Sequence, residues 1–511
     1  MSHKKLTTAV LSGFVAILCF CSTPLVRADV RLPSLFSDNM VLQQGMKVAV
    51  WGWADDGEEI TVTFRGQKLK TTAKDGKWMV QLNKLKAGGP DTLTVAGKNA
   101  VTLKNILVGE VWVCSGQSNM EFALKNSFES KADIDASANP NIRLFHVQKL
   151  KADQPTNDVK ATWQECNPET VPGFSAVGYY FGRDLQKARN VPVGLIESDW
   201  GGSPAEVWMK DEVLESNPRY KREILDGYQS AMKNYEQASA AFETEKAEAK
   251  KSGATFSKKA PGRPSWKPTE LYNGMIAPLV HYGIKGALWY QGESNAGRAE
   301  QYRTLFPDMI RNWRSDWNEG DFTFLLVQLA PFMAIKDQPV ESAWAELREA
   351  QLLTTKVLPK TGMAVITDVG NPVNIHPTKK EPVGVRLALA ARGIAYGEHI
   401  VYSGPIYKSM KVEGNKATLK FDNVGGGLIA RDGDLKGFAV CGEDKKFVWA
   451  TATIEGSGRS SRVVVSAPEV AHPIAVRYGW ADCPVVNLWN KDGLPASPFR
   501  TDDFPMVTAG K

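Results

Sequence analysis

The sequence predicts an α/β protein in which a core with a parallel sheet is flanked by a β domain on each side. Three observations support this class. Apolar strands alternate with amphipathic helices from residue 106 to about residue 400, the order expected of a parallel sheet covered by helices. Short segments of alternating apolar and polar residues, separated by turn residues, fill residues 29–105 and 401–511. The chain has 511 residues, which is long enough for several domains.

The first 28 residues have the pattern of a secretory signal peptide. Lys4 and Lys5 precede a short apolar stretch, residues 9–21, and Val26-Arg27-Ala28 supplies a cleavage site near Ala28. The stretch is short for a membrane anchor, and no later segment is apolar enough to span a bilayer. We therefore expect export, with a periplasmic or extracellular location after cleavage.

Charge and cysteine content narrow the classes of function. The formal net charge is +6, three of the positive charges lie in the leader, and no basic stripe with interleaved aromatic residues indicates a nucleic-acid partner. Neither a C-x-x-C nor an H-E-x-x-H motif occurs, so a structural or catalytic zinc site has little support. The sequence leaves the oligomeric state open. After cleavage, four cysteines remain: Cys114, Cys166, Cys441 and Cys483. The sequence does not decide their disulfide pairing, although Cys441 and Cys483 lie in the same C-terminal region and could pair.

The first polar turn of the core follows the apolar run at residues 106–113. This run predicts a buried strand, and Ser115-Gly-Gln-Ser-Asn119 then turns the chain before helical spacing resumes over residues 120–124. Ser118 is thereby predicted where a strand end meets a helix start. Backbone N–H groups at such a position can stabilise an oxyanion, as at a nucleophile elbow, although the G-x-S-x-G spelling is missing. A serine-rich turn without chemistry is the alternative for this stretch taken alone.

Three later strands also end in polar turns. Residues 193–198 lead into a turn with Gly201 and Gly202, and residues 284–290 lead into Gln291-Gly-Glu-Ser-Asn295. Residues 362–367 lead into a loop that carries His376, which is followed by a helix. Because the carboxyl ends of parallel strands share one edge of a sheet, we expect these turns to meet Ser118 there. Imidazole can accept a serine proton and return it to a leaving group.

The region between the strands at residues 193–198 and 284–290 differs from the core. Residues 210–267 contain a long segment rich in Ala, Glu, Lys and Gln with apolar residues at helical spacing, followed by a stretch with several prolines. We predict an exposed helical insertion whose charges face solvent.

Four ordered motifs together resemble the sialate O-acetylesterase family of the SGNH hydrolases: Ser115-Gly-Gln-Ser-Asn-Met120, Trp200-Gly-Gly202, Trp289-Tyr-Gln-Gly-Glu-Ser-Asn295 and Asp368…Asn374-Ile-His-Pro377. The resemblance covers nearly the whole chain after the leader. It implies a flavodoxin-like SGNH-hydrolase core over residues 106–400, with the helical insertion at about 210–267.

The resemblance also implies roles for single residues. Ser118 is expected to be the nucleophile and His376 the general base, and the oxyanion hole is expected from the backbone N–H groups of Ser118 and Gly202 and a side chain of Gln291 or Asn295. Many relatives in the wider group carry Asp three residues before the histidine, where this chain has Val373. The third member is open between Asp368, Asn374 and a backbone carbonyl, and Asp368 is our prediction.

The function implied is that of a secreted serine esterase that removes O-acetyl groups from carbohydrates, with 9-O-acetylated sialic acids as the first candidate. The acetyl group would pass through an acetyl-enzyme on Ser118, and this mechanism requires no metal and no organic cofactor. We expect Trp200, Glu293 and Arg298 to contact the substrate. A sialate substrate predicts a cationic residue near Ser118, for which Arg298, Arg303 and Arg386 are the candidates.

Two alternatives to this function remain. The first is an acetylesterase acting on a plant polysaccharide, xylan or pectin, for which an open, aromatic-lined cleft is expected. The second is a non-catalytic carbohydrate-binding protein that uses the flanking β domains. Trp449, Trp480 and Trp489 could stack on sugars there, although we favour buried anchors for them.

Overall fold

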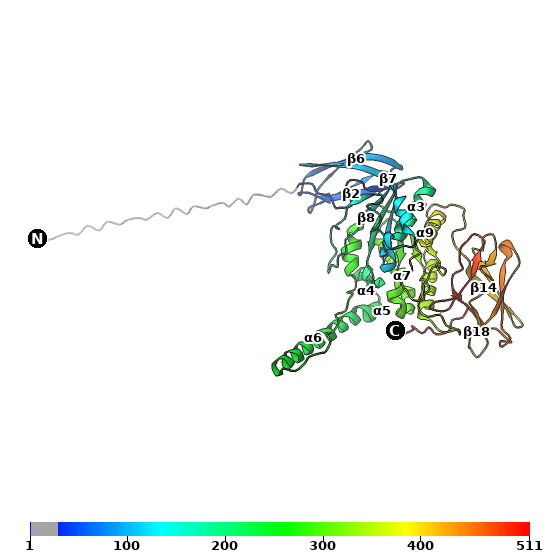
Figure 1. Ribbon diagram of the computed structural model, residues 1–511. Coiled ribbons are helices and arrows are strands. Elements are labelled where there is room, and N and C mark those ends of the chain that lie inside the picture. The colour runs from blue at the N-terminus through cyan, green and yellow to red at the C-terminus, as the bar shows by residue number, and fades with distance from the viewer. Residues whose placement is uncertain (2–28) are drawn as a thin grey trace.

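The computed structural model describes residue 1 and residues 29–511 (Figure 1). The predicted signal peptide therefore lies outside the described residues, apart from Met1. Within the described part of the chain, no helix has both the length and the apolar character needed to cross a membrane.

A central sheet with the order β13-β12-β11-β7-β10-β8-β9 forms the core. The strands from β13 to β8 are parallel, as predicted, but β9 pairs antiparallel with β8 and makes the sheet mixed. The bounds of these strands are β7 Ala100–Gly116, β8 Asn139–His146, β9 Trp163–Cys166, β10 Val193–Asp199, β11 Gly286–Tyr290, β12 Thr323–Val327 and β13 Thr361–Ala364.

Helices cover both faces of this sheet. Alternate side chains of β7 enter two separate cores: Val111 and Val113 pack in one, and Trp112 and Cys114 in the other. The core of Trp112 includes side chains from α3 and α9, and the core of Val111 includes side chains from α7 and α8. The helices are α1 Ser118–Glu121, α2 Ser130–Asp135, α3 Ala176–Arg189, α4 Asp211–Ser216, α5 Pro218–Tyr220, α6 Asp226–Ser252, α7 Ala299–Trp317, α8 Ala343–Val357 and α9 Glu381–Ile394.

The N-terminal β region shares a strand with the core. We predicted a boundary at residues 105 and 106, but β7 runs without a break across it and pairs with β6 and β1 in its first part. The remaining strands of this region are β1 Val41–Gln43, β2 Val48–Trp53, β3 Glu59–Phe64, β4 Gln67–Thr72, β5 Lys77–Leu82 and β6 Gly88–Ala96.

The predicted helical insertion is a long arm. In Figure 1, α6 extends away from the body of the molecule at the lower left. Of its 27 residues only Phe242 is buried, and its ring lies 5.2 Å from that of Phe256 in the returning chain. Solvent therefore surrounds most of the charged side chains of this arm.

The C-terminal region is a β unit with its own hydrophobic core. It contains two four-stranded sheets and one two-stranded sheet. Its strands are β14 Ile406–Glu413, β15 Lys416–Asp422, β16 Leu428–Ala430, β17 Phe438–Cys441, β18 Val448–Trp449, β19 Thr451–Glu455, β20 Arg462–Ser466, β21 Ala475–Tyr478, β22 Leu488–Asn490 and β23 Phe499–Arg500.

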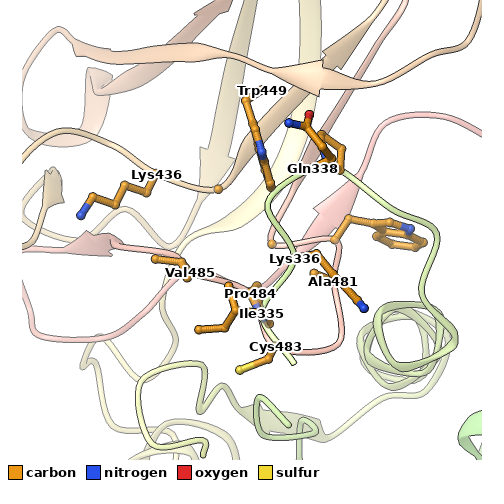
Figure 2. A pocket seen from close by; sticks show the side chains of 13 residues that line it. Ile335, Lys336, Gln338, Lys436, Trp449, Ala481, Cys483, Pro484 and Val485 are labelled. Carbon is orange, nitrogen blue, oxygen red and sulfur yellow. The ribbon is translucent and has the colours of Figure 1, made fainter. Parts of the chain in front are cut away.

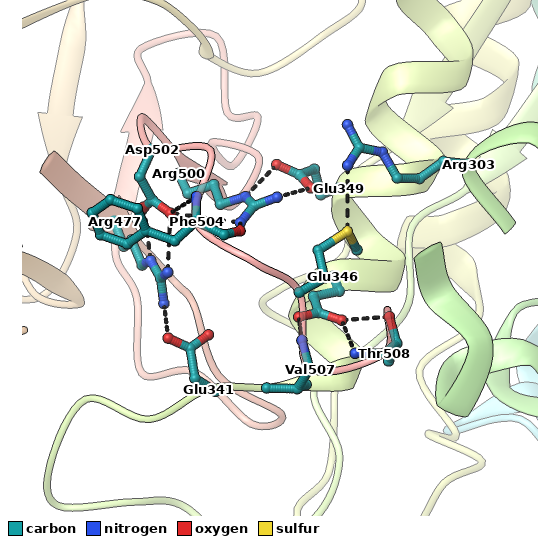
Figure 3. Close-up of polar contacts among 11 residues, drawn as sticks. Arg303, Glu341, Glu346, Glu349, Arg477, Arg500, Asp502, Phe504, Val507 and Thr508 are labelled. Atoms are coloured by element: carbon teal, nitrogen blue, oxygen red, sulfur yellow. Dashed lines mark hydrogen bonds and ion pairs between the residues drawn. The ribbon is translucent and has the colours of Figure 1, made fainter. Parts of the chain in front are cut away.

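Polar contacts fix this β unit on the core (Figure 3). Arg500 binds the carboxylate of Glu349 on α8 with two hydrogen bonds of 2.8 and 3.1 Å. The Glu346 carboxylate accepts hydrogen bonds from the backbone N–H groups of Val507 and Thr508. The C-terminal end of the chain thus packs on α8, the helix that connects β12 to β13.

A pocket lies where the β unit meets the loop before α8 (Figure 2). Trp449 lines it with 43% of its surface exposed, and its indole N–H donates to the Asp337 carbonyl at 2.7 Å. Trp480 and Trp489 are buried, as expected of anchors, so only Trp449 departs from that interpretation. The four described cysteines are all free thiols and buried.

Candidate active site

The backbone at the end of β7 exposes Ser118. Gly116 has φ of +141°, and a Cβ at this position would lie 2.2 Å from the Tyr290 carbonyl oxygen, so only glycine fits the turn. Ser118 begins α1, but this helix is a single turn, and the helix predicted over residues 120–124 does not form. A helix this short adds little dipole, so the backbone N–H groups near Ser118 carry any anion stabilisation.

The loop between β13 and α9 brings His376 to Ser118. Nested side-chain turns shape this loop: the Asn371 side chain accepts hydrogen bonds from the N–H groups of Val373 and Asn374. The Asn374 side chain in turn accepts from the backbone N–H of His376 at 2.9 Å. His376 Nε2 lies 2.8 Å from Ser118 Oγ, which is hydrogen-bonding distance for a nucleophile and its base.

The surroundings of His376 favour the neutral form of its ring. Its pKa is lowered from the usual 6.5, first because burial disfavours the charged ring and second because the Lys380 ammonium repels it. Glu121 acts in the opposite direction. A neutral imidazole is the form that accepts the serine proton.

Asp368 is held by a different partner from the one predicted. Its two carboxylate oxygens accept hydrogen bonds from Arg386 on α9 at 2.6 and 2.8 Å, and Arg386 also donates to the Val365 carbonyl. Among the described residues, no carboxylate is hydrogen-bonded to the ring of His376. Asp368 thus ties the start of the histidine loop to α9, and its assignment as the orienting group stays a prediction.

The glycine turn after β10 runs directly beside the nucleophile. A Cβ on Gly201 would lie 3.2 Å from Ser118 Cβ, and the Gly201 N–H donates to Glu121 at 2.6 Å. Gly202 has φ of +77°, and its carbonyl accepts a hydrogen bond from the Ser294 hydroxyl at 3.0 Å. This contact joins the turn after β10 to the loop that follows β11, residues 291–295.

The side-chain amides of Gln291 and Asn295 mainly stabilise the loop after β11 through hydrogen bonds within the protein. Gln291 uses both amide hydrogens inside the protein, on Asn295 Oδ1 at 2.7 Å and on the Ser203 carbonyl at 3.2 Å. In this arrangement Gln291 has no hydrogen left for an oxyanion. Asn295 donates one amide hydrogen to Glu206 at 3.0 Å, and its second amide hydrogen has no acceptor among the described residues. Of the two predicted side-chain donors, Asn295 is therefore the one that could still bind an oxyanion.

The three candidate arginines are engaged elsewhere. Arg298 pairs with Glu206 and Gln301, Arg386 pairs with Asp368, and Arg303 contacts the sulfur of Met506. Each of the three arginines thus already has a contact within the protein.

Lys149 and Lys151 lie over an aromatic pair beside the site. Lys149 lies 5.4 Å from the ring centroid of Trp200, which directly precedes Gly201, and forms an ion pair with Glu121. Lys151 lies 4.2 Å from the Trp266 ring, and the two indole rings meet edge to face at 5.6 Å.

Two members of a polar cluster under the site, Asn119 and Lys380, were missing from the sequence-based list. Asn119 binds Glu293 and Lys380 through its side chain, and Asn119 and Lys380 have no exposed surface. Glu293 accepts a hydrogen bond from Asn119 at 2.6 Å, and its contact with the substrate stays a prediction. One sequence signal pointed to Lys380: a cation directly before a helix start opposes the preference set by the helix dipole.

The comparisons with known proteins agree on one family. The family model described as "Carbohydrate esterase, sialic acid-specific acetylesterase" matches residues 108–247 and 252–391. This chain belongs to that family of carbohydrate esterases. It is therefore a carboxylic ester hydrolase, and its family membership supports carbohydrate O-deacetylation.

The relatives of this esterase match it over most of its length. Sialate O-acetylesterase of Rattus norvegicus is 30% identical over 92% of this chain and 94% of its own. The enzyme of Homo sapiens is also 30% identical, over 92% of both chains. The solved structure of a carbohydrate acetylesterase from Xanthomonas citri is 40% identical, with a TM-score of 0.80, and covers 93% of this chain and all of its own.

Proposed function

We propose that this esterase is an exported SGNH hydrolase with a flavodoxin-like core over residues 106–400 that removes O-acetyl groups from 9-O-acetylated sialic acids. The contact of 2.8 Å between Ser118 Oγ and His376 Nε2 carries the proposal, because it provides an activated nucleophile at the carboxyl edge of the sheet. The mammalian sialate O-acetylesterases, which match nearly the whole chain, support the choice of sugar.

In the proposed mechanism, Ser118 Oγ attacks the acetyl carbonyl while His376 Nε2 takes its proton. The carbonyl oxygen becomes an oxyanion that the N–H groups of Ser118 and Gly202 and the free amide hydrogen of Asn295 stabilise. The intermediate collapses and the bond between the acetyl carbon and the sugar oxygen breaks. His376 gives its proton to the departing sugar oxygen, which becomes a hydroxyl, and the acetyl group stays on Ser118 as an acetyl-enzyme. His376 then activates water, which releases acetate and restores Ser118. One oxyanion donor contributes roughly 10²–10³-fold to turnover.

A second candidate substrate is an acetylated neutral polysaccharide. Trp200 directly precedes Gly201, which lies beside Ser118, and its indole meets that of Trp266 at 5.6 Å. Carboxylates already neutralise the lysines over these two rings, Lys149 by Glu121 and Lys151 by Glu270. Both of these lysines are therefore already bound to a carboxylate of the protein, and neither is free to bind the carboxylate of a sialic acid. Membership of an enzyme family sets aside the third candidate, a non-catalytic binding protein.

Acetate release distinguishes the two substrates. Wild type, Ser118→Ala and the matched control Ser230→Ala, an exposed serine on α6, are incubated with 9-O-acetylated sialic acid and with acetylated xylan. The proposal predicts release from the sialic acid, its loss in Ser118→Ala and no change in Ser230→Ala. Release from xylan alone would replace the substrate and keep the mechanism. Wild-type rates in Ser118→Ala would overturn the nucleophile.

Export is tested on the same protein. Secreted or periplasmic material from an expressing cell is sequenced from its N-terminus, and the proposal predicts a chain that starts at Asp29. Retention of residues 1–28 in the cytoplasmic fraction would contradict it.

A further inference from the structure

The ammonium of Lys380 lies in an enclosed site next to the Ser118–His376 pair. Lys380 directly precedes α9 and has no exposed surface. Its Nζ donates to Asn119 Oδ1 at 2.5 Å and lies 4.8 Å from the Phe122 ring and 5.1 Å from the Tyr290 ring. The cation thus has one hydrogen-bond acceptor and two aromatic faces.

The Asn119 side chain links this cation to both catalytic residues. Asn119 directly follows Ser118 in the chain. Its Nδ2 donates to Glu293 Oε1 at 2.6 Å and to the carbonyl of Ile375 at 3.1 Å, and Ile375 directly precedes His376. Because Oδ1 must face the ammonium and Nδ2 the carboxylate, Lys380 and Glu293 together fix the direction of this amide.

Stability alone does not explain a lysine at this position. Burying a charged group costs free energy even when it is paired, and an apolar side chain could fill the space between the two rings. The position before a helix start also disfavours a cation. Within the part of the chain that the structure describes, the second oxygen of Glu293 is buried without a hydrogen-bond partner, so the cluster is not optimised for hydrogen bonding either.

We propose that Lys380 is a positioning residue for the general base. It holds the Asn119 amide that anchors the Ile375 carbonyl, and its positive charge opposes protonation of His376. This inference rests on the proposed roles of Ser118 and His376 and adds a residue that acts through them.

The directions of the pKa shifts at Lys380 and His376 support the electrostatic part. Burial lowers the pKa of Lys380 to about 7, with Glu293 acting in the opposite direction. The pKa of His376 is lowered from 6.5 by burial and by Lys380, and raised by Glu121, which is itself paired with Lys149. A charged Lys380 therefore disfavours the protonated form of the His376 ring.

The test is kcat/KM against pH for wild type, Lys380→Met, Lys380→Gln and the matched control Lys379→Met. The control removes a neighbouring exposed lysine. The substrate is 4-nitrophenyl acetate, a small acetyl ester that needs no sugar subsite, and thermal melting verifies folding. A wild type inactive on this ester, or an active Ser118→Ala variant, would contradict the proposed function and not this inference alone.

We expect Lys380→Met to lower kcat by roughly 10–100-fold with KM little changed, since small displacements of a catalytic group have such effects. Its acid limb should move to higher pH by up to about one unit, because a like charge near the imidazole has been removed. Lys380→Gln keeps a donor for Asn119 and should show the shifted limb with a smaller loss of kcat. Lys379→Met should match wild type.

An acid limb at the wild-type position in both Lys380 variants would overturn the electrostatic part, and an unchanged kcat in Lys380→Met would overturn the positioning part. A measurement on wild type keeps the inference testable if the variants do not fold. The ring signal of His376, assigned by comparison with His376→Asn, should titrate below 6.5. Titration at or above this value would contradict the inference.

Discussion

Replacing Asp368 by asparagine separates two roles for this residue. The substitution keeps the size of the side chain and removes its charge. In the structure both carboxylate oxygens bind Arg386, whose side chain is only 11% exposed. Hydrogen bonds to a charged group typically contribute about 1.5–3 kcal/mol, so we expect the variant to lose stability in that range.

The effect on turnover should be small. The turns built on Asn371 and Asn374 still hold His376 at Ser118, so kcat for acetate release should fall by less than about tenfold. A triad aspartate that orients the histidine is worth about 10⁴-fold in turnover. The assay is kcat on an acetyl ester together with the urea midpoint of unfolding.

A double-mutant cycle with Arg386→Gln makes the reasoning stricter. If Asp368 acts through Arg386, each single variant should show a similar loss, and the double variant should lose little more. A drop of about 10⁴-fold in Asp368→Asn with Arg386→Gln near wild type would refute the reasoning and make Asp368 the orienting group.

Three further predictions concern charge and substrate contacts. The acid limb of kcat/KM should lie below pH 6.5, because burial lowers the pKa of His376 and the neutral ring is the active form; a midpoint above 6.5 would contradict this. Burial raises the pKa of Glu197 above its usual 4.5, so the folded state holds a proton that the unfolded state loses, and stability should fall as the pH rises above 4.5. Glu197→Gln should weaken this fall in urea midpoints measured from pH 5 to pH 8.5, and an unchanged slope would count against it. Trp266→Ala should raise KM for the acetylated sugar several-fold and leave 4-nitrophenyl acetate hydrolysis unchanged, and equal losses on both esters would place Trp266 in the fold and not at the sugar.

The sequence allowed the strand ends to be placed, because strand and turn signals are local. The apolar run before Ser115 and the short strands before Trp200, Gln291 and Asp368 all end at one edge of the sheet. The parallel order of the sheet then brought Ser118 and His376 within hydrogen-bonding distance.

The partners of single side chains could not be predicted in this way. Whether Asp368 faces His376 or Arg386 depends on how α9 packs, which local patterns do not encode. The amide hydrogens of Gln291 are used within its own loop, and the buried cluster around Lys380 joins three segments far apart in the chain. The antiparallel edge strand β9 and the continuity of β7 through the predicted boundary likewise depend on tertiary pairing.

The central claim is that Ser118 carries the acetyl group during turnover. The most direct measurement is rapid acid quenching of the enzyme during hydrolysis of an activated acetyl ester, followed by mass spectrometry of its peptides. The account predicts one added acetyl group on the peptide that contains Ser118, and no such adduct in Ser118→Ala. Full turnover without an adduct at Ser118, together with wild-type rates in Ser118→Ala, would contradict it.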